Sequence, residues 1–346
     1  MDAFSTSHSR LSRGCQTCQQ GKWLCIFLTY LCDAKCAFCP APFKQLDTTV
    51  SAFGNDLPTL SKHLEEASFE GISFSGGEVL LAYDRLVTWL TYLKQRFPHC
   101  YFWAYTNGIA IEESHMAMLA REGLNELRFN IAATNYHSAS ILSKIKTAAR
   151  IFEHVAVEIP SIPDDYPTLE PVLHVLDEIK VEYLNLHEYI VVDGDSRVGA
   201  RTGTFTMNKE SVVRYDVDSL ANTQRIVSYC GEQKLRVVVN NCTLRQKENQ
   251  MRQRRLVMGR MLKQQYDKVS EDGILETFLI YPKRLTNVEV LNLLSRNNIG
   301  CDYFAHPDSL DSGLAARHPG TIAKLQFVPP MSIHEKRKLH RVQLVN

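Results

Sequence analysis

Three cysteines in one short segment have the spacing of a metal-cluster ligand set. Cys32, Cys36 and Cys39 are separated by three and then two residues, with Phe38 directly before the last of them. Thiolates bind zinc and iron–sulfur clusters, and a closed site of either kind takes four protein ligands. Three ligands leave one metal position open. We expect this position to bind a small chelating molecule and to pass an electron to it.

A second cysteine pair lies upstream. Cys15 and Cys18 are separated by two residues, which is the commonest half of a protein metal site. In a reducing compartment such clusters more often bind metal or do redox chemistry than form disulfides. A pair cannot close a site alone, and Cys242 and Cys230 are the candidates for the missing ligands. An iron–sulfur cluster, zinc and free thiols all stay open for this set.

The rest of the sequence alternates between strand and helix patterns. Apolar runs predict six strands, at 23–30, 71–75, 101–105, 126–131, 154–159 and 182–186. Apolar residues three and four apart predict the helices between them, at 57–67, 81–96, 114–121, 138–152 and 169–179. This alternation favours parallel strands with right-handed crossovers. The predicted fold is therefore α/β, a partial (β/α)6 barrel of the TIM type with a C-terminal extension.

Polar residues follow or end these strands in a consistent way. The chemistry of such barrels lies at the carboxyl ends of the strands. We therefore expect one site to contain Gly76, Gly77, Glu78, Asn107, Asn130, Glu158, Asn185, His187 and Glu188. The two glycines let the backbone approach a ligand closely, and the carboxylate beside them can accept hydrogen bonds from an ammonium group. Glu158 has an alternative interpretation as a barrel-end ion pair, and His187 and Glu188 have one as purely structural side chains.

The cysteine segment, taken together with Gly76-Gly77-Glu78, resembles the signature of the radical S-adenosylmethionine (SAM) superfamily. The resemblance implies that the three cysteines hold a 4Fe-4S cluster whose fourth iron binds SAM. The reduced cluster would cleave SAM to a 5'-deoxyadenosyl radical, which abstracts hydrogen from a substrate. An external electron donor such as flavodoxin or ferredoxin would supply the electron. Val79 stands where the family usually has a proline.

The resemblance also assigns roles to single residues. The backbone of Phe38 would hold the adenine, the Gly-Gly-Glu strand end would contact the methionyl amino group, and polar side chains on later strands would reach the ribose and carboxylate. The candidates for binding SAM are thus Phe38, Gly76, Gly77, Glu78, Asn107, Asn130 and Glu158. His187 and Glu188 are the candidates for catalytic contact with the substrate.

Residues 14–280 are similar, more narrowly, to a group related to pyruvate formate-lyase activating enzymes. Cys15, Cys18 and Cys242 match the recurring extra cysteines of that group, with Cys230 as a candidate fourth. This implies an auxiliary iron–sulfur cluster, or zinc, near the open end of the barrel. The substrate stays open between a small molecule, a peptide and a protein. One alternative is a glycyl-radical-enzyme activase, and another is a non-catalytic zinc-binding module that contacts RNA or protein.

The composition excludes several other classes. Hydrophobic residues make up 45% and charged residues 22%, so the chain is globular rather than fibrous or disordered. A net charge of +1 gives no general attraction to nucleic acid or to an anionic membrane. The longest apolar run, 23–32, is about half of the roughly 20 residues that a spanning helix needs, and 1–13 has no apolar signal region. We expect a cytoplasmic enzyme without membrane or nucleic-acid partners.

The expected organisation has four parts. An N-terminal segment with the cysteine pair covers 1–20, and the barrel core covers 21–190. A C-terminal part with a basic helix and an Asp-Gly hairpin covers 191–282, and an extension of unknown role covers 283–346. The basic stretch at 245–260 is either a solvated helix face or a contact for an anionic substrate.

Overall fold

The computed structural model describes most of the chain, in two compact units. The described residues are 10–39, 56–67, 69–192, 201–209, 211–295, 300–310, 318–329 and 338–345. The first unit comprises Met1–Met207 and Ser211–Asn249, and the second comprises Asn208–Glu210 and Gln250–Asn346. No helix among the described residues is both long enough and apolar enough to cross a membrane.

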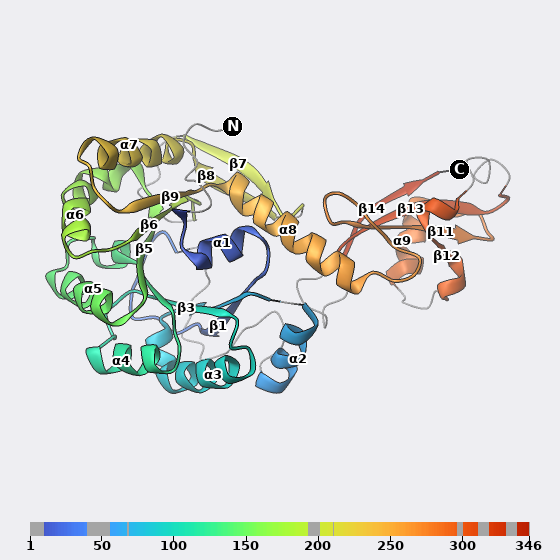
Figure 1. Cartoon of the computed structure of the whole chain (residues 1–346). Helices are drawn as coiled ribbons and strands as arrows, with labels where there is room; N and C mark the ends of the chain where they lie inside the picture. Colours follow the sequence, from blue (N-terminus) through green and yellow to red (C-terminus); the bar gives the residue numbers. More distant parts are fainter. Residues whose placement is uncertain are drawn as a thin grey trace. The chain divides into compact units, whose positions relative to one another are not determined.

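The first unit is built on one parallel sheet of seven strands, in the order β1-β2-β3-β4-β5-β6-β9 (Figure 1). Its strands are β1 (Trp23–Thr29), β2 (Gly71–Gly76), β3 (Tyr101–Thr106), β4 (Glu126–Phe129), β5 (His154–Ser161), β6 (Tyr183–Glu188) and β9 (Val238–Cys242). All six predicted strands are present, in sequence order and parallel, so the α/β partial barrel is confirmed. The seventh strand, β9, was not predicted.

Helices connect the strands and cover the outside of the curved sheet, as Figure 1 shows. They are α2 (Leu57–Ala67), α3 (Tyr83–Arg96), α4 (Glu113–Arg121), α5 (Ala139–Ile151), α6 (Tyr166–Glu178) and α7 (Ser219–Glu232). The five helices predicted between the strands agree with α2 to α6 within a few residues. Short 3-10 turns, η2 (Val79–Ala82), η3 (Ile131–Thr134) and η4 (Pro163–Asp165), precede three of them.

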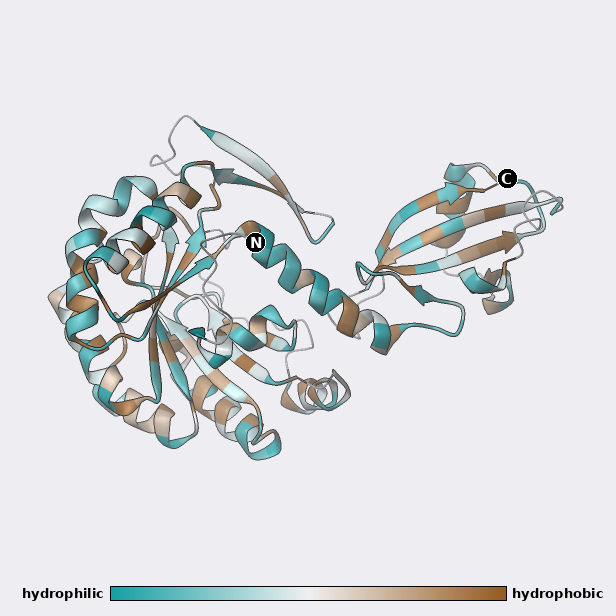
Figure 2. Ribbon diagram, turned by 45° about the horizontal axis from the view of Figure 1, so that its top comes forward, coloured by the Kyte–Doolittle hydropathy of each residue, from teal (hydrophilic) through white to brown (hydrophobic). Residues whose placement is uncertain are grey.

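Strand residues alternate between the helix-covered outside and the interior of the barrel. Ile26, Phe74 and Leu127 are fully buried on the outer side, because the helices remove their apolar surface from water. The strands are accordingly mostly hydrophobic in Figure 2. On the inner side the register aligns Cys25 with Ser73, and Glu158 with Asn185 and then Asn240. Much of the barrel interior is therefore polar.

A short helix, α1 (Arg13–Gln19), lies inside the curve of the sheet (Figure 1). Ser12 caps it by accepting a hydrogen bond from the backbone N–H of Cys15 at 3.2 Å. Gly14 lies so close to the sheet that a Cβ there would be 2.6 Å from Nη2 of Arg128. A larger residue would therefore push α1 away from the barrel interior.

After β6 the chain forms an antiparallel hairpin of β7 (Thr202–Met207) and β8 (Ser211–Asp216). It continues through α7 and β9 into the long helix α8 (Leu244–Leu262). Figure 2 shows α8 as hydrophilic along most of its length, in agreement with the predicted basic helix.

Besides the later part of α8, the described residues of the second unit form a five-stranded sheet and helix α9. The elements are β10 (Lys268–Val269), β11 (Leu275–Tyr281), α9 (Asn287–Ser295), η5 (Cys301–Tyr303), β12 (Phe304–Ala305), η6 (Pro307–Ser309), β13 (Thr321–Val328) and β14 (Lys338–Leu344). The predicted hairpin around Asp272-Gly273 joins β10 to β11, and Gly273 supplies the positive φ of its turn.

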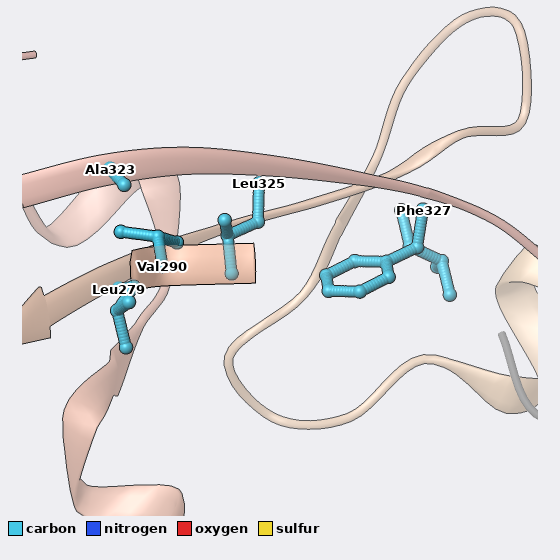
Figure 3. Close-up of a cluster of buried hydrophobic side chains, with 6 residues drawn as sticks. Leu279, Val290, Ala323, Leu325 and Phe327 are labelled. Atoms are coloured by element: carbon cyan, nitrogen blue, oxygen red, sulfur yellow. The ribbon is translucent and has the colours of Figure 1, made fainter. Parts of the chain in front are cut away.

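The core of this unit lies between the sheet and α9. Val290 of α9 packs with Leu279, Leu325 and Phe327 of the strands (Figure 3). Because β11 pairs directly with β13, one sheet continues across the boundary expected between 282 and 283.

Candidate functional site

A cavity of about 460 Å³ lies at the carboxyl ends of the barrel strands. This volume is within the usual range of small-molecule sites. The predicted residues that line it are Cys32, Cys36, Phe38, Cys39, Gly76, Gly77, Glu78, Asn107, Asn130, Glu158, His187 and Glu188. The structure thus brings the first cysteine set and the candidate binding and catalytic residues of the later strands to one place.

The cysteine loop follows β1 and is attached to the loop after β3. Nδ2 of Asn107 donates a hydrogen bond to Oδ1 of Asp33 at 2.6 Å and lies 3.9 Å from Sγ of Cys32. Burial raises the pKa of the Cys32 thiol. Within the described residues no three His, Cys, Asp or Glu side chains are already grouped to hold a metal ion. The three thiols therefore share the cavity without forming a preformed three-sulfur site.

Gly76 and Gly77 lie against the segment that leads into the cysteine loop. The backbone N–H of Gly77 donates to the carbonyl of Thr29, and that of Glu78 donates to the carbonyl of Leu31, both at 2.8 Å. A Cβ on Gly77 would lie 1.9 Å from the Leu31 oxygen, and one on Gly76 would lie 2.3 Å from the Thr29 oxygen. The sequence predicted a close approach to a ligand. In the structure the close approach is to the chain's own backbone, which positions the loop.

Glu78 is buried, and its carboxylate is fully used by neighbouring donors. It accepts hydrogen bonds from the backbone N–H groups of Leu80 and Asn107 and from the hydroxyl of Thr106, at 3.1, 2.7 and 2.8 Å. Burial raises the pKa of Glu78 to about 7, although these hydrogen bonds act in the opposite direction. The side chain therefore joins the end of β2 to the end of β3.

Asn130, at the end of β4, has a different status. Its Oδ1 is buried and accepts no hydrogen bond from any described residue, while the residue lines the cavity. A buried acceptor without a partner costs about 1–3 kcal/mol. A ligand that donates a hydrogen bond there would remove that cost.

Three charged side chains form a buried network under the cavity. Nε of Arg128 donates to Oε1 of Glu126 at 2.6 Å, and its Nη1 donates to Oε2 of Glu158 at 2.7 Å. The guanidinium also lies over the rings of Trp103 and Tyr105. Burial by itself would raise the pKa of Glu158, but Arg128 and His187 hold that pKa well below its ordinary value. Glu158 is therefore an ionised carboxylate paired with Arg128, in line with its alternative interpretation as part of a barrel-end ion pair.

The last two predicted residues lie at the end of β6. Nε2 of His187 is 2.8 Å from Oε1 of Glu158. Burial, followed by the nearby charge of Lys247, lowers the pKa of His187 against the opposing effect of Glu158. Glu188 accepts a hydrogen bond at 2.7 Å from the backbone N–H of Leu244, which begins α8. Glu188 thus fixes the start of α8 beside the cavity.

The second cysteine set is partly assembled, from α1 and the end of β9. Burial raises the pKa of Cys18 strongly, and the proximity of Cys242 and Cys15 adds to the effect. Cys15 contacts Oδ1 of Asn185 at 3.5 Å. Cys230 lies on α7, where burial and Asp177 of α6 raise its pKa to about 11. Cys18 therefore lies near both Cys242 and Cys15, although within the described residues the three do not form a group that could already hold a metal ion. Cys230 is not among the neighbours that shift the pKa of Cys18.

Sequence reasoning did not single out Arg128, Tyr105 or Lys247, although all three line the cavity. For Arg128 a signal was present. It is two residues before Asn130, so the alternation of a strand places both side chains on the inner face. Lys247 carried no such signal, because α8 has basic residues on several sides.

The fold and the site define an enzyme of the partial-barrel α/β class, with a cysteine loop at the carboxyl ends of its strands. Residues 26–159 match the family model of the Radical SAM superfamily. A curated protein of Methanocaldococcus jannaschii, named for a proposed role as a glycyl-radical enzyme activating enzyme, is 25% identical over 303 residues, which cover 84% of this chain and 79% of that protein. Residues 26–159 thus correspond to a radical SAM domain, and the two matches support a radical SAM enzyme over a non-catalytic zinc module.

Two solved structures illustrate the structural likeness. Streptococcus suis SuiB bound to S-adenosylmethionine superposes with a TM-score of 0.46 at 15% identity, over 64% of this chain and 50% of SuiB. The chain thus spans about half the length of SuiB. Methylornithine synthase superposes with a TM-score of 0.45 at 11% identity, over 67% of this chain and 69% of the synthase.

The match of residues 26–159 to the radical SAM family model indicates SAM and an iron–sulfur cluster as cofactors. The cavity fits both. Three thiols reach it from one loop, and thiolates are the usual ligands of such clusters. The unpartnered Oδ1 of Asn130 suits a ligand with amino and hydroxyl donors.

Proposed function

We propose that this enzyme cleaves SAM reductively at a 4Fe-4S cluster held by Cys32, Cys36 and Cys39 and abstracts hydrogen from a substrate. When bound, the cluster and SAM supply the electron and the 5'-deoxyadenosyl group for this chemistry. The observation that carries the proposal is the single cavity lined by the three thiols, the Gly76-Gly77 backbone and Asn130. These three groups belong to the loop after β1, the end of β2 and the end of β4, so it is the fold that brings them to one cavity.

The chain's own residues have mainly positioning roles in this proposal. Asn107 and Glu78 tie the cysteine loop to the ends of β2 and β3 through hydrogen bonds. Gly76 and Gly77 allow the loop to pack against β2. The backbone of Phe38 would hold the adenine, and Asn130 would accept a hydrogen bond from SAM. Glu158 would reach SAM only with an oxygen that it already shares with Arg128 or His187.

The substrate would bind on the opposite side of the cavity, near His187 and Glu188. A small molecule, a peptide and a protein are all candidate substrates. The relative from Methanocaldococcus jannaschii favours one particular version, activation of a glycyl-radical enzyme by hydrogen abstraction from a protein. A ferredoxin or flavodoxin would supply the electron.

We also propose an auxiliary metal site on Cys15, Cys18 and Cys242, as an iron–sulfur cluster or as zinc. The proximity of Cys18 to both Cys242 and Cys15 supports it. Deprotonating them in a buried site is unfavourable without a cation, and a bound metal supplies one.

Anaerobic reconstitution tests the main proposal. Iron and sulfide are counted in the wild type and in the Cys32→Ala/Cys36→Ala/Cys39→Ala variant, and 5'-deoxyadenosine is measured after reduction with dithionite. The wild type should bind at least about four iron atoms in the form expected for a 4Fe-4S cluster and release 5'-deoxyadenosine. The triple variant should release none. Cys100→Ala, which removes a buried thiol outside the cavity, is the matched control. Product formation by the triple variant would refute the proposal.

A further inference from the structure

The charged side chains that line the cavity are not all paired among the described residues. Three carboxylates line it, on Glu78, Glu158 and Glu188. Each one accepts hydrogen bonds from donors in the wall: Glu78 from Asn107, Leu80 and Thr106, Glu158 from Arg128 and Asn185, and Glu188 from Leu244. Glu78 and Glu158 are thus each held by several donors, and Glu188 is held by a backbone N–H at the start of α8.

The two cations that line the cavity differ from each other. Arg128 is buried and pairs with both Glu126 and Glu158. Lys247, in the first turns of α8, has no carboxylate partner among the described residues, yet it lines the cavity. Its ammonium is close enough to lower the pKa of His187. Lys247 is thus the cation lining the cavity that no described carboxylate pairs with.

The local backbone keeps Lys247 at this place. Glu188 and Thr243 hold the start of α8 through hydrogen bonds to the backbone N–H groups of Leu244 and Gln246, at 2.7 and 3.0 Å. His187, whose pKa the Lys247 charge lowers, is held by Glu158 through Nε2. A cation that is fixed in a partly enclosed cavity recognises an anionic group through a charge-assisted hydrogen bond.

We propose that Lys247 binds a carboxylate group of the substrate at the side of the cavity formed by β6 and α8. This inference deepens the proposed function and rests on it, because it names the chemical class of the substrate. The carboxylate belongs either to a small acid or to an aspartate or glutamate of a peptide. The reacting hydrogen would then lie between this anchor and the cysteine loop.

Binding of simple carboxylates to the reconstituted full chain with SAM tests the proposal. Saturation-transfer NMR compares propionate with propionamide, and N-acetyl-aspartyl amide with N-acetyl-asparaginyl amide. Wild type should bind at least one carboxylate and neither amide. Lys247→Met should weaken carboxylate binding by about tenfold or more, and Lys247→Arg should retain most of it. Arg245→Met is the matched control, because Arg245 is exposed on the same helix and does not line the cavity.

The outcomes separate the sources of the carboxylate. Binding of propionate alone identifies a small-acid substrate. Binding of N-acetyl-aspartyl amide alone identifies a peptide substrate. Either result supports the proposal. Equal binding of acid and amide, or full binding by Lys247→Met, would overturn it. A tenfold weaker SAM affinity of Lys247→Met in equilibrium dialysis would also overturn it, since Lys247 would then hold the cosubstrate's carboxylate. Wild type that releases no 5'-deoxyadenosine refutes the proposed function instead, whatever the carboxylates do.

Discussion

Arg128 and Glu158 form an ion pair across β4 and β5, with 2.7 Å between Nη1 and Oε2. Their side chains are 4% and 13% exposed, so the pair is almost completely removed from water. Arg128 also pairs with Glu126, and Glu158 also contacts His187. The network therefore connects the barrel interior beside α1 with the wall of the cavity.

Replacing Glu158 by glutamine should destabilise the protein strongly. The amide leaves the buried guanidinium with only Glu126 as a counter-ion, and breaking a buried pair typically costs about 3–5 kcal/mol. Urea denaturation at pH 7 measures the change in the free energy of unfolding. Glu65→Gln, which breaks the exposed pair with Arg96, is the matched control and should cost less than about 1 kcal/mol. Similar losses in both variants would contradict the assignment.

The same carboxylate predicts a pH dependence. The pKa of Glu158 is lower in the folded state than in the unfolded chain, so its contribution to stability is fully present above the unfolded value of about 4.3. This contribution is lost as the pH falls below that value towards the depressed folded pKa. The difference in unfolding free energy between wild type and Glu158→Gln should therefore shrink between about pH 5 and pH 3. A constant difference over this range would show that the pKa of Glu158 is not depressed.

A methyl group on Gly77 should disturb the cysteine loop. Its Cβ would lie 1.9 Å from the carbonyl oxygen of Leu31, so the backbone must move. We expect Gly77→Ala to lower the free energy of unfolding by roughly 3 kcal/mol and to reduce iron loading. Gly231→Ala is the control, because nothing lies within 4 Å of its Cβ position on α7. That variant should be stabilised by about 0.5–1 kcal/mol and load iron normally. Normal iron loading by Gly77→Ala would contradict this role.

The sequence was sufficient where one physical signal dominated. Helix α2 begins and ends at the predicted residues, 57 and 67, because its apolar residues recur with helical spacing. The strands were found because parallel strands covered by helices are continuous apolar runs. Strand β9 was missed because the two asparagines of Val238-Val239-Asn240-Asn241-Cys242 interrupt the apolar run. Asn240, which is aligned with Asn185, faces the mostly polar barrel interior.

The partners of the site residues were beyond the sequence for a different reason. Glu158 pairs with Arg128, which is 30 residues away in the sequence, and Lys247 lines the cavity from α8. Contacts between residues so far apart produce no local sequence pattern. Helix α1 has no apolar periodicity, because it packs among polar side chains such as Arg128. The residue types of the site were predictable, but their pairing depends on which strands are neighbours.

The second cysteine set predicts a selective change in metal content. Replacing Cys15, Cys18 or Cys242 singly by alanine should release metal beyond the main cluster, because Cys18 lies near both of the other two thiols. Cys230→Ala should keep that metal, because Cys230 lies on α7 beside Asp177. Iron, sulfide and zinc are counted in each reconstituted variant, with 5'-deoxyadenosine as the readout of the main cluster. Iron near four with no zinc in the wild type would remove the auxiliary site.

Asn130 offers a way to separate binding from stability. Its Oδ1 is buried without a hydrogen-bond partner among the described residues, so Asn130→Leu removes a cost rather than a contact. We expect an unfolding free energy that is unchanged or higher by about 1 kcal/mol, and SAM binding at least about tenfold weaker in equilibrium dialysis. Asn107→Leu is the contrasting variant, because it loses hydrogen bonds to Asp33 and to the backbone of Ile109 and should be less stable. If Asn130→Leu is destabilised as much as Asn107→Leu, or binds SAM as well as the wild type, Asn130 does not accept a hydrogen bond from SAM.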